Sequence, residues 1–206
     1  MQIEGSTFIV TGGASGLGAA TAQMIVDGGG RVVIADLKDD EGRACATTLG
    51  GAARFVHTDV ADEASGKAAI AAAIDTFASV HGLVNCAGIV HGEKVVGKDG
   101  PHTLAGFARA IGINLIGTFN LVRLAADAMT KNTPNAGGER GVIVNTASVA
   151  AFDGQIGQAA YSASKAGVAG MTLPIARELA RFALKEVVSH LPQIVKASFA
   201  PQRSLH

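Results

Sequence analysis

The sequence predicts an α/β fold in which a doubly wound parallel sheet lies between two layers of helices. Short apolar runs alternate with longer alanine-rich segments along the 206 residues, and no internal repeat interrupts this order. Each apolar run is almost continuously hydrophobic, as is typical of a strand that helices cover on both faces. Repeated strand–helix alternation indicates parallel strands joined by right-handed crossovers, so we expect three layers, α/β/α.

Five apolar runs are the expected strands. They are TFIVT (7–11), RVVIAD (31–36), ARFVHTD (53–59), GLVNCAG (82–88) and GVIVNTAS (141–148). The segments between and after them predict helices at about 16–28, 40–49, 62–80, 103–131 and 158–182. Turn-forming residues fill NTPNAGGER (132–140), which predicts a loop before the fifth strand.

Composition and charge predict a single domain over residues 1–206. Hydrophobic residues make up 48% of the chain, which is enough for one core. The 17 basic residues balance the 17 acidic ones, so the charge indicates neither a nucleic acid nor an anionic membrane as a partner. No apolar run reads as long enough to span a bilayer, and the N-terminus shows neither a secretory signal nor a transit segment.

The cysteines and histidines indicate neither disulfide bonds nor a metal site. Cys45 and Cys86 fit neither a disulfide scaffold nor a metal-binding pattern, so we expect reduced thiols and a cytoplasmic location. The six histidines show no H-x-x-x-H or H-E-x-x-H spacing, and we expect no metal site.

A glycine-rich turn follows the first strand and opens the first helix. In TGGASGLG, Gly12, Gly16 and Gly18 follow the pattern G-x-x-x-G-x-G. Glycine lets the backbone turn tightly and approach a pyrophosphate, whose charge then lies at the helix N-terminus. Such turns also form for steric reasons alone, but the position between a first strand and a first helix favours a dinucleotide site.

Asp36 ends the second strand, about twenty residues beyond the glycines, where an acid meets the adenosine ribose of a bound dinucleotide. A carboxylate there binds the ribose diol of NAD and repels the extra phosphate of NADP. Asp36 could instead cap a helix, and Lys38 is the nearest cation. We favour NAD as the cofactor.

The ends of the third and fourth strands are further candidate cofactor contacts. Asp59 and Val60 follow the third strand, where the adenine would lie, and Cys86, Ala87 and Gly88 follow the fourth. Small residues there would let the backbone reach the cofactor. No histidine is placed in the sequence to activate Cys86, so it reads as a small apolar wall rather than a nucleophile.

Tyr161, the single tyrosine, stands one helical turn before Lys165, so both project from the same helix face. A tyrosine with a pKa near ~10 is a poor base at neutral pH, but a nearby ammonium favours the phenolate. Ser148 ends the fifth strand at its carboxyl edge, where open α/β sheets place ligands. Its hydroxyl can donate to the same substrate oxygen that the tyrosine protonates.

Asn114 is a fourth candidate. It interrupts the apolar helix AIGINLIGTFN, where asparagine is unfavourable unless its amide has a partner. Two interpretations stay open for it, a satisfied asparagine of the core and a functional group.

These motifs together resemble the short-chain dehydrogenase/reductase family, which has a Rossmann-type fold. The likeness rests on TGGASGLG, NCAG, Asn114, Ser148 and Y-S-A-S-K, and covers about residues 5–182. The stretches at 102–124 and 141–180 further resemble the type 2 3-hydroxyacyl-CoA dehydrogenases, the group that includes 17β-hydroxysteroid dehydrogenase type 10. The resemblance implies NAD-linked interconversion of 3-hydroxyacyl-CoA and 3-oxoacyl-CoA, a reaction of fatty acid metabolism. It also implies a homotetramer built through the long fourth and fifth helices, and it makes a mitochondrial location possible.

Residue roles follow from the same resemblance. Tyr161 would be the general acid/base, Ser148 would orient and polarise the reacting oxygen, and Asn114 would hold a proton-relay water. Lys165 would bind the nicotinamide ribose and lower the pKa of the tyrosine. The expected cofactor contacts are Gly12, Ser15, Gly16, Leu17, Gly18, Asp36, Asp59, Val60, Cys86, Ala87, Gly88, Tyr161 and Lys165; the expected substrate contacts are Ser148, Gln155 and Tyr161.

The likeness ends after Phe182, and residues 183–206 depart from the family pattern. No sixth or seventh strand is visible there, and Leu184–Val195 reads as an amphipathic helix left from a substrate lid. Either a mobile lid and the last strands belong to a longer protein, or the fold is shortened and leaves a sheet edge uncovered. The substrate pocket and the tetramer contacts depend on this choice, whereas the cofactor half does not.

Other functions fit the same motifs. A hydroxysteroid or other secondary-alcohol dehydrogenase would use the same residues, because the fold does not determine the substrate. A carrier-protein-linked 3-oxoacyl reductase usually uses NADP, which Asp36 disfavours. A dinucleotide-binding scaffold with little turnover is the alternative from outside the enzymes.

Overall fold

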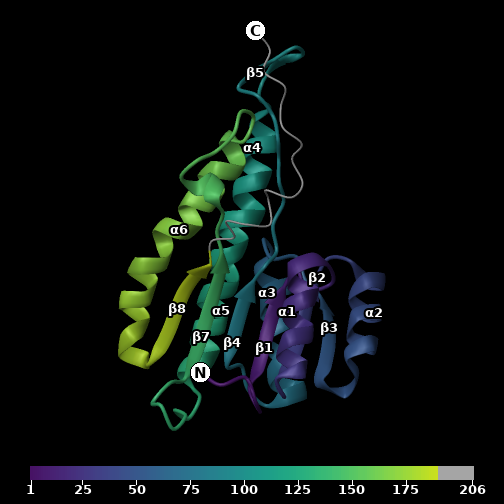
Figure 1. The fold of residues 1–206 in the computed structure, drawn as a ribbon, viewed down its shortest axis with the longest axis vertical. Helices are drawn as coiled ribbons and strands as arrows, with labels where there is room; N and C mark the ends of the chain where they lie inside the picture. Colours follow the sequence, from purple (N-terminus) through teal and green to yellow (C-terminus); the bar gives the residue numbers. More distant parts are fainter. Residues whose placement is uncertain (190–206) are drawn as a thin grey trace.

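The computed structural model describes residues 1–189, which form a parallel sheet with helices on both faces (Figure 1). The six strands of the sheet run in the order β3-β2-β1-β4-β7-β8. They are β1 (Thr7–Thr11), β2 (Arg31–Asp36), β3 (Ala53–His57), β4 (Gly82–Asn85), β7 (Gly141–Thr146) and β8 (Leu184–Ser189). All five pairs of neighbouring strands are parallel, so the predicted doubly wound sheet is confirmed.

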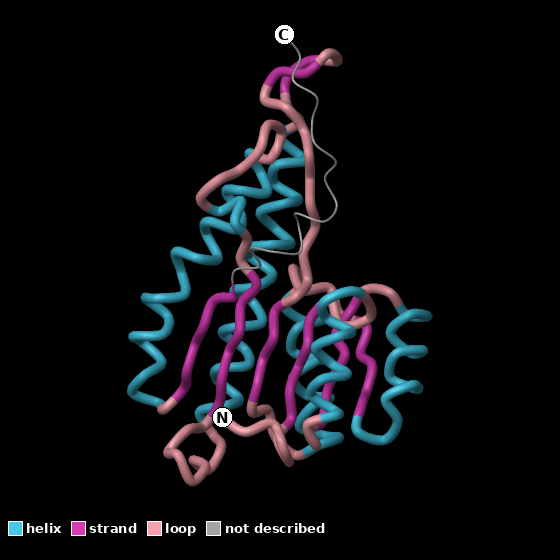
Figure 2. Tube along the Cα trace, viewed as in Figure 1, coloured by secondary structure: helices cyan, strands magenta, loops and turns pink. Residues whose placement is uncertain are grey.

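Helices form the two outer layers, as the tube view also shows (Figure 2). They are α1 (Gly16–Asp27), α2 (Asp39–Leu49), α3 (Glu63–Phe77), α4 (Leu104–Ile111), α5 (Thr118–Thr130) and α6 (Ala159–Leu179). Short 3-10 turns follow at η1 (Gly50–Ala52), η3 (Val149–Ala151) and η4 (Ala180–Phe182), and a small hairpin pairs β5 (Val96–Gly97) with β6 (Gly100–Pro101). The predicted helices are present within a few residues of their expected bounds.

The C-terminal prediction is wrong over the residues that the structure describes. Leu184–Ser189 is not part of an amphipathic helix; it is a sixth strand that pairs with β7 from Gly141↔Leu184 to Thr146↔Ser189. The open edge of β7 supplies backbone partners that a sequence pattern does not reveal, and Leu184 and Glu186 are both buried there. The rest of the expected helix, up to Val195, and the question of a seventh strand lie outside the described residues.

Two apolar cores lie on opposite faces of the sheet. On one face, Ile9, Leu83 and Ile143 pack with Leu121 and Met129 of α5. On the other, Val10 and Ile34 are examples of the side chains that α1 and α2 cover. Fully burying one such aliphatic side chain stabilises the fold by about 1.5–3 kcal/mol, so strands buried on both faces dominate the apolar contribution.

The fourth predicted helix contains an irregular segment. α4 and α5 are joined without a break by a π-helical stretch, η2 (Gly112–Gly117), and Asn114 lies inside it. The whole helix, Leu104–Thr130, is long and apolar enough to cross a membrane, which the sequence reading had not expected. Within the described fold, α5 instead packs on the sheet and on α3, and eight of its residues are buried there.

The order of the strands determines where a ligand would bind. From β1 the chain moves outward to β2 and β3, then crosses back to β4 on the other side of β1. The carboxyl ends of β1 and β4 therefore meet at the reversal of strand order, and open α/β sheets bind ligands in the crevice at that point.

Candidate active site

The glycine turn after β1 is packed so closely that side chains cannot replace its hydrogens. Gly12 has φ +65°, and a Cβ there would lie 2.8 Å from the backbone nitrogen of Ala87. A Cβ on Gly18 would collide with the carbonyl oxygen of Gly12. The turn, the start of α1 and the end of β4 can approach one another only because both positions are glycine.

The N-terminus of α1 offers free backbone donors. Ser15 is the N-cap, its side chain makes no capping hydrogen bond, and the first turn of α1 holds no acidic residue. The first N–H groups of a helix lack partners within the helix and carry a partial positive charge. They suit the pyrophosphate of a dinucleotide.

Asp36 supports this turn from the end of β2. One carboxylate oxygen accepts a hydrogen bond from the backbone of Ala14 at 3.0 Å, and the other accepts from the backbone of Lys38 at 3.1 Å. The carboxylate therefore connects the glycine turn to the segment that follows β2, in addition to any contact with a ribose.

A cleft of about 420 Å³ lies along these elements. Ten of the expected cofactor contacts line it: Gly12, Ser15, Leu17, Gly18, Asp36, Asp59, Val60, Cys86, Ala87 and Gly88. The other three expected contacts, Gly16, Tyr161 and Lys165, do not line it; Gly16 begins α1 with φ +53°. Seven lining residues had not been anticipated: Ala35, Leu37, Lys38, Thr58, Ile89, Arg109 and Ile113. The size of the cleft, its glycine cradle and the free donors of α1 fit a dinucleotide.

Cys86 is a wall of this cleft rather than a nucleophile. Burial raises the pKa of its thiol, and the hydroxyl of Thr146 lies 4.0 Å from the sulfur. A thiol with a raised pKa stays protonated at neutral pH and is a poor nucleophile.

A chain of buried hydrogen bonds crosses four strands and ends in the cleft. Asn145 donates to Glu186 at 2.6 Å, and Asn85 donates to Asn145 at 2.9 Å. Thr11 donates to Asn85 at 3.3 Å and accepts from the backbone nitrogen of Ala87 at 3.1 Å. This chain therefore runs from β8 through β7, β4 and β1 and orients the backbone at Ala87.

Lys165 lies buried beside the end of β7. Its Nζ donates to the carbonyl oxygen of Thr146 at 2.7 Å and lies 6.0 Å from the centre of the Tyr161 ring. Burial lowers the pKa of Lys165 to about 8. The side chain is therefore mostly a cation at neutral pH, close to the tyrosine that it is expected to influence.

Asn114 is fully buried, and its amide bridges three segments. Its oxygen accepts from the backbone of Ile89 at 2.8 Å, and its nitrogen donates to the carbonyl of Ile89 at 2.9 Å and to Ser164 Oγ at 3.0 Å. A Cβ on Gly88 would lie 3.1 Å from the Asn114 oxygen and 3.7 Å from Lys165 Nζ. Gly88, which lines the cofactor cleft, therefore lies next to two of the expected catalytic residues, Asn114 and Lys165.

Ser148 and Gln155 lie on the segment between β7 and α6. Ser148 is the N-cap of η3, and its Oγ accepts from the backbone of Ala150 at 3.2 Å, which leaves its hydroxyl proton free to donate. η3 packs against α6, the helix that carries Tyr161. Gln155, expected as a substrate contact, is exposed and does not line the cofactor cleft.

Three polar residues of the site had not been identified from the sequence. Ser164 accepts from Asn114 and donates to the Tyr161 carbonyl at 2.7 Å, Thr146 supplies the carbonyl that holds Lys165, and Thr11 positions Ala87. Ser164 lies within Y-S-A-S-K, so its position in the motif was the one available signal.

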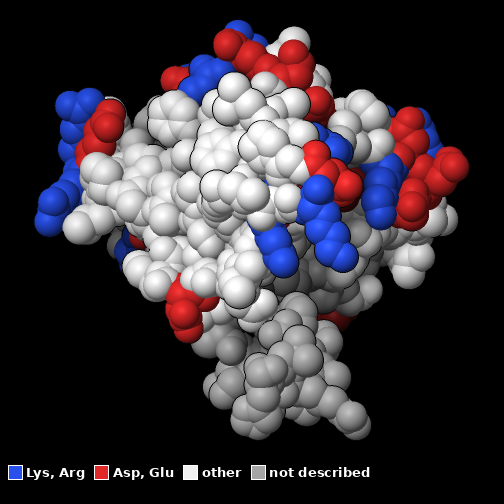
Figure 3. All heavy atoms as spheres, turned by 90° about the horizontal axis from the view of Figure 1, so that it is seen from above, with Lys and Arg blue, Asp and Glu red and all other residues white. Residues whose placement is uncertain are grey.

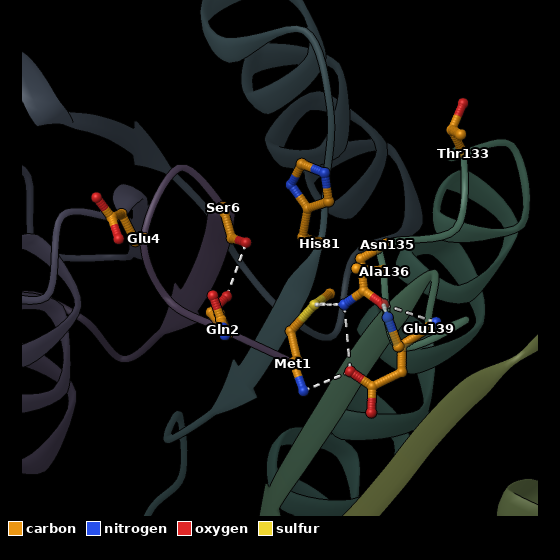
Figure 4. A pocket seen from close by; sticks show the side chains of 10 residues that line it. Met1, Gln2, Glu4, Ser6, His81, Thr133, Asn135, Ala136 and Glu139 are labelled. Carbon is orange, nitrogen blue, oxygen red and sulfur yellow. Dashed lines mark hydrogen bonds and ion pairs between the residues drawn. The ribbon is translucent and has the colours of Figure 1, made fainter.

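A second hollow of about 420 Å³ lies at the opposite edge of the sheet (Figure 4). It is lined near the amino ends of the strands, where the Met1 amino group lies 2.5 Å from a Glu139 carboxylate oxygen and Ser6 donates to the carbonyl of Gln2. Lys185 also contacts Glu139, and together these groups hold the pKa of that carboxyl at about 2. None of the predicted catalytic or cofactor residues lines this hollow.

The fold and the site together define a class of protein, the oxidoreductases that use a nicotinamide dinucleotide. The defining features are the doubly wound parallel sheet, the glycine turn at β1, and a serine, a tyrosine and a lysine beyond β7. The family model described as short chain dehydrogenase matches residues 6–204. The chain belongs to the short chain dehydrogenase family, and the resemblance seen in its motifs is confirmed.

Individual relatives are similar over most of the chain. The 3-hydroxyacyl-CoA dehydrogenase type-2 of Bos taurus is 50% identical over 186 residues, which cover 89% of this chain and 71% of the relative. A crystal structure of 3-hydroxyacyl-CoA dehydrogenase type-2 from Mycobacterium avium is 42% identical with a TM-score of 0.85, over 89% of this chain and 73% of that one.

A third comparison concerns the cofactor. The 3-ketoacyl-(acyl-carrier-protein) reductase from Brucella melitensis, solved in complex with NADH, is 32% identical with a TM-score of 0.81. The match covers 91% of this chain and 75% of the reductase. It supports a nicotinamide dinucleotide as the cofactor class.

Proposed function

We propose that this chain interconverts 3-hydroxyacyl-CoA and 3-oxoacyl-CoA by hydride transfer, with NAD as the cofactor. The observation that carries the proposal is that Asn114 and Lys165 lie against Gly88, which lines a cleft that fits a dinucleotide, and that Lys165 Nζ lies 6.0 Å from the centre of the Tyr161 ring. The substrate class comes from the relatives named 3-hydroxyacyl-CoA dehydrogenase type-2.

In the oxidative direction the substrate alcohol loses a hydride from carbon and a proton from oxygen. NAD, held by the residues of the cleft, would supply the acceptor for the hydride. Tyr161 Oη accepts the hydroxyl proton, and Ser148 donates a hydrogen bond to the same oxygen. Reduction of the ketone reverses both transfers, with Tyr161 as the proton donor.

Lys165 supports the proton transfer at Tyr161 through its positive charge. Lys165 has a pKa of about 8 and so remains largely charged at neutral pH, close to the Tyr161 ring. Its hydrogen bond to Thr146 keeps the ammonium in this position, and Asn114 anchors the neighbouring backbone at Ile89.

The position of Asp36 supports NAD rather than NADP. Its carboxylate lines the cleft at the end of β2, where the 2′-phosphate of NADP would meet a negative charge. Lys38 also lines the cleft, but it lies 3.9 Å from Glu41, which partly offsets its charge.

The surroundings of Ser148 support an acyl substrate. Val149, Phe152 and Ile156 are exposed on the segment that follows it. Figure 3 shows a broad area without Lys, Arg, Asp or Glu on the face that is seen from above. A hydroxysteroid is the second candidate, since an apolar surface would suit that substrate too.

The proposal includes a homotetrameric assembly and a reducing compartment. Ile116 and Phe119 are exposed on η2 and α5, where a homotetramer of this chain would bury them. Cys45 and Cys86 are both free, which suits a reducing compartment such as the cytoplasm or the mitochondrial matrix.

The test is the variant Tyr161→Phe, assayed by the oxidation of NADH with acetoacetyl-CoA. Loss of the phenol hydroxyl removes the proton donor while keeping the ring, so we expect kcat to fall by about 10²–10⁴-fold in a protein that still binds NADH. Wild-type protein that binds NADH but reduces neither acetoacetyl-CoA nor a ketosteroid would support the scaffold alternative. Faster turnover of the ketosteroid would support the second candidate.

A further inference from the structure

Three polar side chains form a cluster outside the cofactor cleft. His91 and Glu93 lie on the segment after β4, and His102 lies directly before α4. One ring nitrogen of each histidine and one carboxylate oxygen of Glu93 lie within 4.8 Å of one another. His91 Nε2 is 2.8 Å and His102 Nδ1 is 3.6 Å from the same Glu93 oxygen.

The fold creates this cluster from residues that sequence spacing did not connect. The β5–β6 hairpin reverses the chain, and the backbone nitrogen of His102 donates to the carbonyl of Val95 at 3.0 Å. His102 is thereby brought beside His91 and Glu93. Spacing rules for metal sites compare histidines along one helix or loop, so they did not indicate this group.

The ring of His102 has unused bonding capacity. Its side chain is 10% exposed, and its Nδ1 lies 2.8 Å from the carbonyl oxygen of Thr103. Donation to this carbonyl requires the proton on Nδ1, so the lone pair of the neutral ring is on Nε2. Nε2 is therefore the atom that would bind an ion, and the 3.6 Å from Nδ1 to Glu93 shows only how close the ring lies to the carboxylate. Nε2 is buried and has no hydrogen-bond partner within residues 1–189. A backbone carbonyl on the other ring nitrogen is also the usual partner of a metal-binding histidine.

Glu93 is held in place by neighbours that would remain with a bound ion. It accepts from the backbone nitrogen of Thr103 at 2.6 Å and from the Thr103 hydroxyl at 2.9 Å. Thr103 therefore positions both the carboxylate and the ring of His102. Such second contacts fix the orientation of metal ligands and contribute to affinity.

We propose that His91, Glu93 and His102 form a binding site for one divalent transition-metal ion of the Zn²⁺ class. Two imidazoles and one carboxylate are a donor set that Zn²⁺ prefers, whereas Ca²⁺ and Mg²⁺ prefer oxygen ligands. Bonds of about 2.0–2.2 Å to each ligand require the three side chains to close around the ion. The ion would take the place of the contact between His91 and Glu93.

The bound ion would act as a structural clamp. It would fasten the segment after β4 to the start of α4. The backbone nitrogen of Glu93 also donates to the carbonyl of Gly157 at 2.8 Å, directly before the helix that carries Tyr161. The proposal is independent of the reaction proposed above, because no catalytic step passes through this site.

Titration of chelator-treated full-length protein with Zn²⁺, followed by calorimetry, tests the proposal. We expect one saturable site whose affinity falls at least about tenfold in His91→Gln and in His102→Gln. His57→Gln is the matched control, because His57 also contacts a carboxylate, Asp39 at 2.9 Å, on an exposed part of the surface. Its Zn²⁺ affinity should equal that of the wild type.

Absence of saturable binding in the wild type, or unchanged affinity in both cluster variants, would overturn the site. His102→Gln alters a buried ring and can fail to fold, whereas His91 is 29% exposed and more tolerant of change. Anomalous diffraction at the zinc edge from wild-type crystals gives a second answer. A peak between the three side chains supports the site, and zinc bound only elsewhere rules it out.

Discussion

Asp36 shows how one residue serves both the fold and the proposed specificity. Its two oxygens accept from the backbone of Ala14 and of Lys38, so it stabilises the glycine turn without any cofactor. Asp36 does not cap a helix, because Lys38 is the N-cap of α2 and no side chain caps that helix. Support of the turn by Asp36 and a contact of Asp36 with a ribose are compatible. Only the second of these depends on the negative charge.

Asp36→Asn separates the two roles, because asparagine keeps a carbonyl oxygen for the backbone of Ala14 but loses the charge. We expect the ratio of kcat/KM for NADP to that for NAD to rise about tenfold, equivalent to about 1.4 kcal/mol of removed repulsion. Steady-state kinetics with both cofactors measures this ratio. An unchanged ratio would mean that Asp36 only supports the turn.

At the scale of secondary structure, the contact between α1 and the turn after β1 depends on missing side chains. Gly18 belongs to α1, where glycine is unfavourable for a helix, yet any Cβ there meets the carbonyl of Gly12. Glycine at this position lets the helix approach the turn closely, but it lowers the intrinsic stability of the helix. That approach determines where the donors of its N-terminus point.

Gly18→Ala should therefore destabilise the protein and weaken NAD binding. Overpacking of this kind typically costs about 1–3 kcal/mol, and the helix N-terminus would shift away from the pyrophosphate. Gly170→Ala in α6 is the matched control, since nothing lies within 4 Å of its added Cβ. It should stabilise the protein by about 0.5–1 kcal/mol. Thermal unfolding and NAD calorimetry measure both; wild-type NAD affinity in Gly18→Ala would contradict the expectation.

At the scale of the whole molecule, the hydrogen-bond chain from Glu186 to Ala87 connects the last described strand to the cofactor cleft. Burial raises the pKa of Glu186 from 4.5 to about 7, and one of its carboxylate oxygens has no partner in the described part of the chain. The sheet thus contains a carboxyl that folding favours in its protonated form.

Stability should consequently fall as pH rises from 4.5 to about 7, because the unfolded chain releases this proton first. Glu186→Gln keeps the acceptor for Asn145 and removes the titration. We expect it to be more stable than the wild type by about 1–3 kcal/mol above pH 7 and equally stable near pH 4.5. Urea unfolding at both pH values measures this. Equal stability above pH 7 would show that Glu186 ionises freely in the fold.

The sequence by itself determined the elements that local chemistry specifies. Apolar runs buried on both faces predicted five strands, and Gly12, Gly18, Tyr161 and Lys165 follow motifs whose spacing is set within one turn or one helix. Such features depend on neighbours a few residues away, so they are visible in the chain.

Tertiary structure decided what depends on residues far apart in the sequence. β8 formed because the edge of β7 was open, although Leu184–Val195 read as a helix. The chain of hydrogen bonds from Glu186 to Ala87 and the cluster of His91, Glu93 and His102 likewise join segments that only the crossovers and the hairpin bring together. Hydrogen bonding and burial act through space, so a pattern read along the chain does not contain them.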